Sequence, residues 1–226
     1  MFKSHMLRSI KKRVAEENRR LTEYKLVILT EGNVSEISPD RTFFVIKPSG
    51  VEYENLTPAK TVVVDMNGRV IKGKFRPSTD APTHLEIYKE FPEIGGIAHT
   101  HSPYATIFAQ MMRPIPCYGT THADLCGEIP VARPLTDKEI RDDYEKNTGK
   151  AICEILRNGH VPCILVPAHG PFTFGRNAKE AVEHAQILEK IAMMAILGTH
   201  KGPIKKTLFR KHHDRKHGKN HYYGQT

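Results

Sequence analysis

The 226-residue sequence predicts one α/β domain, a three-layer α/β/α arrangement with a mixed, largely antiparallel central sheet. Two observations favour this class. Strand-like and helix-like segments alternate along the whole chain, without internal repeats or a Pro/Ser-rich linker. The connections between them are not uniformly strand–helix–strand, as a regular parallel sheet would require. A chain of this length can bury a substantial core as one unit, so we expect residues 1–226 to form a single domain.

The first third of the chain is predicted to hold a helix followed by strands. Apolar residues recur at helical spacing between charged ones in the opening segment, at Leu7, Ile10, Val14 and Leu21. Strand-like runs follow at residues 25–30 and 42–50. Residues 61–73 read as a hairpin, because Asn67 and Gly68 form a favoured two-residue turn between two apolar runs.

The remainder alternates between helices and strands. A capping box of Thr136 and Glu139 marks the start of one helix, and Asn177 is a plausible N-cap for another. Helices are expected in the second half of 77–91 and at 103–112, 136–159 and 177–198. Strands are expected at 95–101 and at the start of 162–175, where a turn follows.

The formal net charge of +9 is concentrated at the two ends of the chain. Residues 201–226 contain eight Lys/Arg and one acidic residue and residues 1–20 contain seven and two, which leaves −3 for the body. The basic C-terminal segment alone would suggest a solvated tail or a nucleic-acid-binding arm. Because the body is acidic and no recognised nucleic-acid motif occurs, we expect no nucleic-acid partner.

Membrane and secretory signals are lacking in this sequence. No run of about 18 apolar residues occurs, and the N-terminus has no apolar signal stretch. The four cysteines show no C-x-x-C spacing, which is typical of free thiols in a reducing compartment. We expect a cytoplasmic protein without a membrane partner. Residues 1–5 are either a tag or extension before Met6 or part of the native chain.

Three histidines and one carboxylate are candidates for a metal site. His99 and His101 are two residues apart at the end of an apolar run, so in a strand they would point to the same face. His169 also ends an apolar strand, and Asp80 lies in a polar turn before a helix. Such a set suits Zn²⁺ or another borderline divalent ion. The alternative is that these side chains only cap turns and strand ends.

Three turns next to strands carry groups that bind anions. Residues 31–35, 47–50 and 77–79 offer hydroxyls, amides and backbone N–H groups, and Lys47 adds a positive charge. The same residue types are common in any turn, so each signal is weak alone. No P-loop and no G-x-G-x-x-G motif occurs, which argues against nucleotide binding of those kinds.

Several motifs together resemble the class II aldolase/adducin-like family, and within it the L-ribulose-5-phosphate 4-epimerases. The resemblance runs in order from about Met6 to Gln225. It is carried by "LTEGNVS", "FFVIKPSGVEY", "PSTDAPTH", "GGIAHTHSPYATIFAQ", "GTTHAD", "HGPFTFG" and "RKHGKNHYYGQT". The resemblance implies a class II aldolase-like fold.

The resemblance also implies roles for individual residues. It implies one catalytic zinc per chain, held by Asp80, His99, His101 and His169. It implies a phosphate site formed by Asn33, Lys47, Ser49, Gly50, Ser78 and Thr79, with Arg215 possible beside it. The acid/base pair would be Asp124 and Tyr223, with His212 next to them.

The implied reaction is zinc-dependent 4-epimerisation of L-ribulose 5-phosphate to D-xylulose 5-phosphate, in L-arabinose or L-ascorbate breakdown. The family also implies a homotetramer in which the basic segment 201–226 completes the active site of a neighbouring subunit. Two alternatives remain. One is a sugar-phosphate aldolase of the L-fuculose-1-phosphate type, in which a glutamate stands at the position of Asp80 and acts as the acid/base rather than as a metal ligand. The other is a non-catalytic, adducin-head-like interaction module.

Overall fold

The computed structural model describes residues 2–159, 161–219 and 222. Seven strands form one sheet in the order β4-β3-β2-β1-β5-β7-β6, and every neighbouring pair is antiparallel. The strands are β1 (Asn33–Ile37), β2 (Phe43–Ile46), β3 (Val62–Asp65), β4 (Val70–Lys72), β5 (Gly96–His99), β6 (Cys163–Val166) and β7 (Gly170–Gly175). The helices are α1 (Phe2–Glu23), α2 (Ala81–Glu90), α3 (Pro103–Gln110), α4 (Thr120–Leu125), α5 (Asp137–Leu156), α6 (Ala178–Leu197) and α7 (Lys206–His217).

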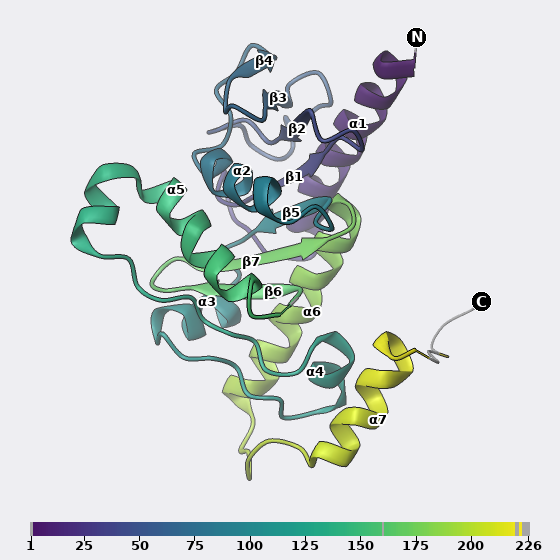
Figure 1. Cartoon of the computed structure of the whole chain (residues 1–226), viewed down its shortest axis with the longest axis vertical. Helices are drawn as coiled ribbons and strands as arrows, with labels where there is room; N and C mark the ends of the chain where they lie inside the picture. The colour runs from purple at the N-terminus through teal and green to yellow at the C-terminus, as the bar shows by residue number, and fades with distance from the viewer. Residues whose placement is uncertain (1, 160, 220–221, 223–226) are drawn as a thin grey trace.

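Helices cover both faces of this sheet, which confirms the expected three-layer α/β/α class (Figure 1). Successive strand residues point to opposite faces. In β2, Phe44 and Ile46 pack in the core cluster that includes α2 and α5, whereas Val45 packs in the cluster that includes α1. The other face of β5 carries Ala98, which lies in a third cluster with α6. Among the described residues, the one parallel pairing is an isolated bridge from Val131 to Leu165.

Two helices lie apart from the sheet, at the lower right of Figure 1. The short helix α4 packs against α7, which is the last helix of the chain. None of the residues of α7 is buried. No described helix combines the length and apolar character needed to cross a bilayer.

The structure confirms most of the predicted elements. The opening helix, the hairpin around Gly68, the capping box of Thr136 and Glu139, and the Asn177 cap are all present. The segment 162–175 contains two strands, β6 and β7, on either side of the turn with His169.

The strand predicted at residues 25–30 is wrong. Its backbone turns instead, because Lys25 and Leu29 adopt left-handed conformations with φ of 57° and 51°. Leu26 and Val27 are buried in the cluster with α6, whereas Ile28 and Leu29 are exposed. The strand begins only at Asn33.

Candidate metal centre and anion-binding cavity

A cavity of about 360 Å³ lies where β1 begins, β5 ends and α2 begins. Its lining combines three histidines, three carboxylates and one lysine with the hydroxyl-bearing turns. The lining residues are Thr30, Glu31, Gly32, Asn33, Lys47, Pro48, Ser49, Gly50, Ser78, Thr79, Asp80, His99, His101, Tyr144, Glu145 and His169. All ten residues predicted for the metal and the phosphate from residues 33 to 169 therefore line one cavity.

The sheet brings the three histidines together. His99 is the last residue of β5, where it pairs with Asn33 on one side and Phe172 on the other. Its ring is buried and stacks on the Phe172 ring at 4.2 Å between centroids. His169 reaches the same place from the tight β6–β7 turn, because Gly170 has no Cβ to collide with the Thr100 carbonyl oxygen.

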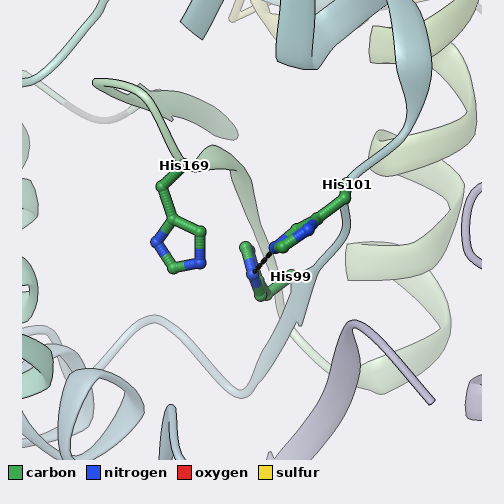
Figure 2. A group of neighbouring side chains, drawn as sticks. All are labelled: His99, His101 and His169. Carbon is green, nitrogen blue, oxygen red and sulfur yellow. Dashed lines mark hydrogen bonds between the residues drawn. The ribbon is translucent and has the colours of Figure 1, made fainter. Parts of the chain in front are cut away.

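The imidazoles of His99, His101 and His169 face one another (Figure 2). The Nε2 atoms of His99 and His101 lie 3.1 Å apart, and one candidate ligand atom from each ring lies within 4.8 Å of the others. Burial and the two neighbouring imidazoles hold the pKa of His99 well below its ordinary value. The His99 ring is therefore in the neutral form that binds a metal.

Asp80 completes a donor set that fits a borderline divalent cation. It stands at the N-cap of α2, but its side chain makes no capping hydrogen bond. Its Oδ2 lies 3.9 Å from His99 Nε2 and accepts a hydrogen bond from Asn33 Nδ2 at 2.7 Å. The Asp80 carboxylate therefore does not cap the turn, which was the alternative to a role in metal binding. Three imidazoles and one carboxylate are ligands that zinc and similar ions accept.

Lys47 provides the positive charge of the cavity. Its side chain is buried, and Nζ donates to the Thr30 carbonyl at 2.9 Å and lies 4.8 Å from the centre of the Tyr53 ring. Burial lowers the pKa of Lys47 to about 8. In the described part of the chain no carboxylate lies within 4.0 Å of Nζ, so its charge is available to an anion.

The two hydroxyl-bearing turns lie side by side. A bridge between Pro48 and Pro77 joins them, and the Ser78 N–H donates to the Lys47 carbonyl at 2.9 Å. Gly50 has a φ of 66°, which favours glycine. Ser49, Gly50 and Thr79 are exposed, so their polar groups can contact a bound ligand. Hydroxyl and amide donors of this kind commonly bind the oxygen atoms of an anion.

The predicted acid/base residues occupy a different place in the structure. Asp124 is in α4, where it accepts two hydrogen bonds from Arg215 of α7, at 3.0 and 2.5 Å. His212 Nδ1 lies 3.4 Å from Asp124 Oδ1. Partial burial raises the pKa of Asp124, but the hydrogen bonds and charge of Arg215 outweigh it and the net shift is downward. Tyr223 lies outside the described residues.

Asp124, His212 and Arg215 thus form a cluster with one another and do not line the cavity of their own chain. Conversely, the sequence reasoning missed Glu31, Tyr144 and Glu145, which do line it. Glu31 lies in the predicted turn at residues 31–35, but nothing in the sequence connects its charge with His101, which is 70 residues later. No local signal marks Tyr144, which lines the cavity and directly follows the non-helical residue Asp143 of α5.

Comparison with solved structures identifies the fold. An L-fuculose 1-phosphate aldolase is 25% identical, with a TM-score of 0.76 and coverage of 92% of this chain and 95% of the other. The L-fuculose 1-phosphate aldolase from Glaciozyma antarctica PI12 is 22% identical, with a TM-score of 0.78 and coverage of 95% and 84%. YgbL from Escherichia coli, a putative aldolase/epimerase/decarboxylase, is 20% identical, with a TM-score of 0.77 and coverage of 92% and 99%.

A family model supports the same assignment from the sequence. Residues 12–196 match the model described as Class II Aldolase and Adducin N-terminal domain. The matched segment contains the whole sheet and every residue that lines the cavity. The chain belongs to the class II aldolase and adducin N-terminal domain family.

Proposed function

We propose that this protein is a metal-dependent sugar-phosphate epimerase that converts L-ribulose 5-phosphate to D-xylulose 5-phosphate. The supporting observation is the cavity itself, in which a His₃–Asp donor set lies beside Lys47 and two hydroxyl-bearing turns. One end can bind a divalent cation and the other a phosphate. A phosphorylated substrate with oxygen atoms that reach the cation fits both ends.

The stereochemistry of the substrate requires carbon–carbon bond cleavage. The C4 hydrogen next to an ordinary hydroxyl is not acidic, so direct deprotonation cannot invert C4. Cleavage of C3–C4 places the electron pair in an enediolate conjugated with the C2 ketone, and re-addition to the other face of the aldehyde inverts C4. A divalent cation supplies Lewis-acid stabilisation of that negative charge, which is worth several kcal/mol.

The residues of this cavity would bind and orient the two fragments. Lys47, Ser49 and Ser78 would bind the phosphate of the aldehyde fragment, so that it stays in the cavity while its carbonyl turns. The Asn33 amide would keep the Asp80 carboxylate directed toward the histidines, at its present hydrogen-bond distance of 2.7 Å. Zinc is the ion that we propose for this site.

Proton transfer at the C4 hydroxyl needs two groups on opposite sides. We propose Asp124 and Tyr223 for these roles, with His212 beside Asp124. Because Asp124 does not line the cavity of its own chain, this proposal requires a neighbouring subunit to bring it there. A homotetramer with shared active sites and the segment 201–226 at the interface would meet that requirement. Arg215 would orient Asp124 through its hydrogen bonds or bind the phosphate.

The deciding experiment is incubation of the zinc-loaded protein with L-ribulose 5-phosphate. We expect D-xylulose 5-phosphate as the product, followed by a coupled assay or by carbon-13 NMR. Absence of any turnover by the zinc-loaded protein would contradict an enzymatic role and favour an interaction module.

A second candidate is a sugar-phosphate aldolase, which the 25% identical L-fuculose 1-phosphate aldolase favours. Both reactions use the same bond cleavage, so the product distinguishes them. Dihydroxyacetone as the main product from L-ribulose 5-phosphate, or efficient cleavage of L-fuculose 1-phosphate, would favour the aldolase. Asp80, with one methylene fewer than glutamate, favours a ligand role and hence the epimerase.

A further inference from the structure

In each histidine of the candidate metal centre, the Nδ1 atom lies beside a different protein group. His99 Nδ1 lies 3.0 Å from the Pro171 carbonyl oxygen, which can only accept a hydrogen bond. His169 Nδ1 lies 3.2 Å from the Tyr144 hydroxyl, and His101 Nδ1 lies 3.6 Å from Glu31 Oε2. A neutral imidazole that donates from Nδ1 has its lone pair on Nε2. The Pro171 contact therefore leaves Nε2 of His99 for the metal, and the Tyr144 hydroxyl and Glu31 carboxylate, which can both accept from Nδ1, favour the same atom in His169 and His101.

The Glu31 carboxylate is fixed by its own turn. The Ile28 N–H donates to Glu31 Oε1 at 2.9 Å, and the Tyr53 hydroxyl donates to the Glu31 carbonyl. The next residue, Gly32, has a φ of 70°, and a Cβ there would lie 2.8 Å from the His99 carbonyl oxygen. The turn is thus packed directly against the end of β5. Its second carboxylate oxygen, Oε2, is the one directed at His101.

Tyr144 is placed by an irregularity in α5. The preceding residue, Asp143, has φ and ψ of −163° and 82°, which interrupts the helix. The Thr148 hydroxyl donates to the Tyr144 carbonyl at 2.9 Å and so supports the first turn after the break. Tyr144 lines both the metal cavity and an adjacent, mainly apolar cavity of about 290 Å³. Its hydroxyl is the group that meets His169.

We propose that Glu31 and Tyr144 are positioning residues of the metal centre, which direct Nε2 of His101 and His169 toward the ion. The Pro171 carbonyl does the same for His99. A carboxylate on Nδ1 also makes His101 a stronger donor, as second-layer carboxylates do in zinc sites. Neither residue belongs to the proposed ligand set, so both would act through a histidine. This inference rests on the proposed metal-dependent function.

The test measures zinc affinity by competition with a chromophoric chelator, for metal-free proteins whose melting temperatures match that of the wild type. Glu31→Ala and Tyr144→Phe should each weaken zinc binding by about 10- to 100-fold. Glu31→Gln should lose less than Glu31→Ala, because its amide oxygen still accepts a hydrogen bond. Matched controls are Glu52→Gln, at an exposed position, and Tyr24→Phe, whose hydroxyl contacts Arg20; both should bind zinc like the wild type.

A spectroscopic measurement separates positioning from a general structural effect. With nitrogen-15-labelled histidine, the zinc-loaded wild type should show Nδ1-protonated imidazoles for His99, His101 and His169. Tyr144→Phe should shift the Nδ1 resonance of His169 and leave that of His99 unchanged. Zinc affinities and spectra equal to the wild type in Glu31→Ala and Tyr144→Phe would overturn this inference alone. A wild-type protein that binds no zinc would overturn the proposed function with it.

Discussion

The Asn33 side-chain amide donates to Asp80 Oδ2 at 2.7 Å and to the Ser78 hydroxyl at 3.0 Å. One buried side chain therefore joins the proposed metal end of the cavity to its proposed anion end. Asn33 can do this because it is the first residue of β1 and pairs with His99. A substitution of Asn33 should therefore affect both ends of the cavity.

Asn33→Ala should raise the substrate KM and weaken zinc binding in the same variant. The Asp80 carboxylate would lose the amide donor, and the Ser78 hydroxyl would keep only the longer contact from the Asp80 N–H at 3.3 Å. Loss of a group that orients a metal ligand commonly costs about 10- to 100-fold in metal affinity. Steady-state kinetics and zinc competition check the two effects. A change in only one of them would show that Asn33 does not connect the two ends.

Removal of the metal should abolish activity, and zinc should restore it. This prediction rests on the donor set of His99, His101, His169 and Asp80. Elemental analysis should find one ion per chain before chelation and none after it. His169→Ala should lose the ion without unfolding the sheet, checked by circular dichroism. Full activity in a preparation shown to be metal-free would contradict the metal-dependent mechanism.

The pH profile should report the state of Lys47. Because burial lowers the pKa of Lys47 to about 8, the side chain is charged below that pH and loses its charge above it. Since kcat/KM reports groups of the free enzyme, it should fall as pH rises through about 8. Lys47→Arg keeps its charge at that pH, so its fall should move to higher pH. An identical alkaline limb in both proteins would assign the fall to another group.

Lys47→Ala should mainly raise KM. Phosphate binding contributes to the ground state and the transition state alike, so kcat should change little. A change confined to kcat would place Lys47 outside the phosphate site.

Two glycines of the cavity should differ in their tolerance of alanine. Gly50 has a φ of 66° with open space around a Cβ, so Gly50→Ala should cost about 1–2 kcal/mol in free energy of unfolding. Gly32 has a φ of 70°, and its Cβ would also meet Val27 Cγ1 at 2.7 Å. Gly32→Ala should therefore cost about 1–3 kcal/mol more. Urea unfolding of the metal-free proteins measures both, and equal losses would mean that the turn at Gly32 relaxes.

Shared active sites predict complementation between two inactive proteins. Asp124→Asn and Tyr223→Phe should each be inactive as homo-oligomers. In a ring that sets one subunit's Asp124 opposite the next subunit's Tyr223, mixed reassembly after dissociation would give some interfaces with both wild-type residues, and activity should return well above either parent. Parental activity despite demonstrated subunit exchange would show that Asp124 and Tyr223 of one site come from the same chain.

The sequence predicts the fold well where apolar periodicity and capping agree. The α5 start is an example, since Thr136 and Glu139 make the predicted reciprocal hydrogen bonds. The strand prediction for residues 25–30 is wrong because an apolar run indicates burial but does not determine the direction of the backbone. Leu26 and Val27 are indeed buried, yet the chain reverses around them. The helix α7 was missed because it has no buried residue and so no apolar stripe.

For the candidate site, strand ends and turn residues are visible in the sequence, but contacts between distant segments are not. His99 and His101 were expected to share a strand face; β5 ends at His99, and the two rings still meet. Glu31 and Tyr144 reach the histidines only through a left-handed turn and a helix irregularity. No residue pattern marks the irregularity at Asp143 beforehand, and Gly32 marks a turn without showing which distant residue the turn contacts.

The strand order has a consequence for how the protein assembles. Strands β1 to β4 follow one another along the chain and pair as a local meander, and β6 with β7 forms a local hairpin. Only β5 joins the two units, by pairing with β1 on one side and β7 on the other. Pairings between distant segments close late, since they must overcome more chain entropy. His99 sits in that joining strand, so we expect the candidate metal centre to form only after β5 has paired with both β1 and β7, and an incompletely folded chain to lack it.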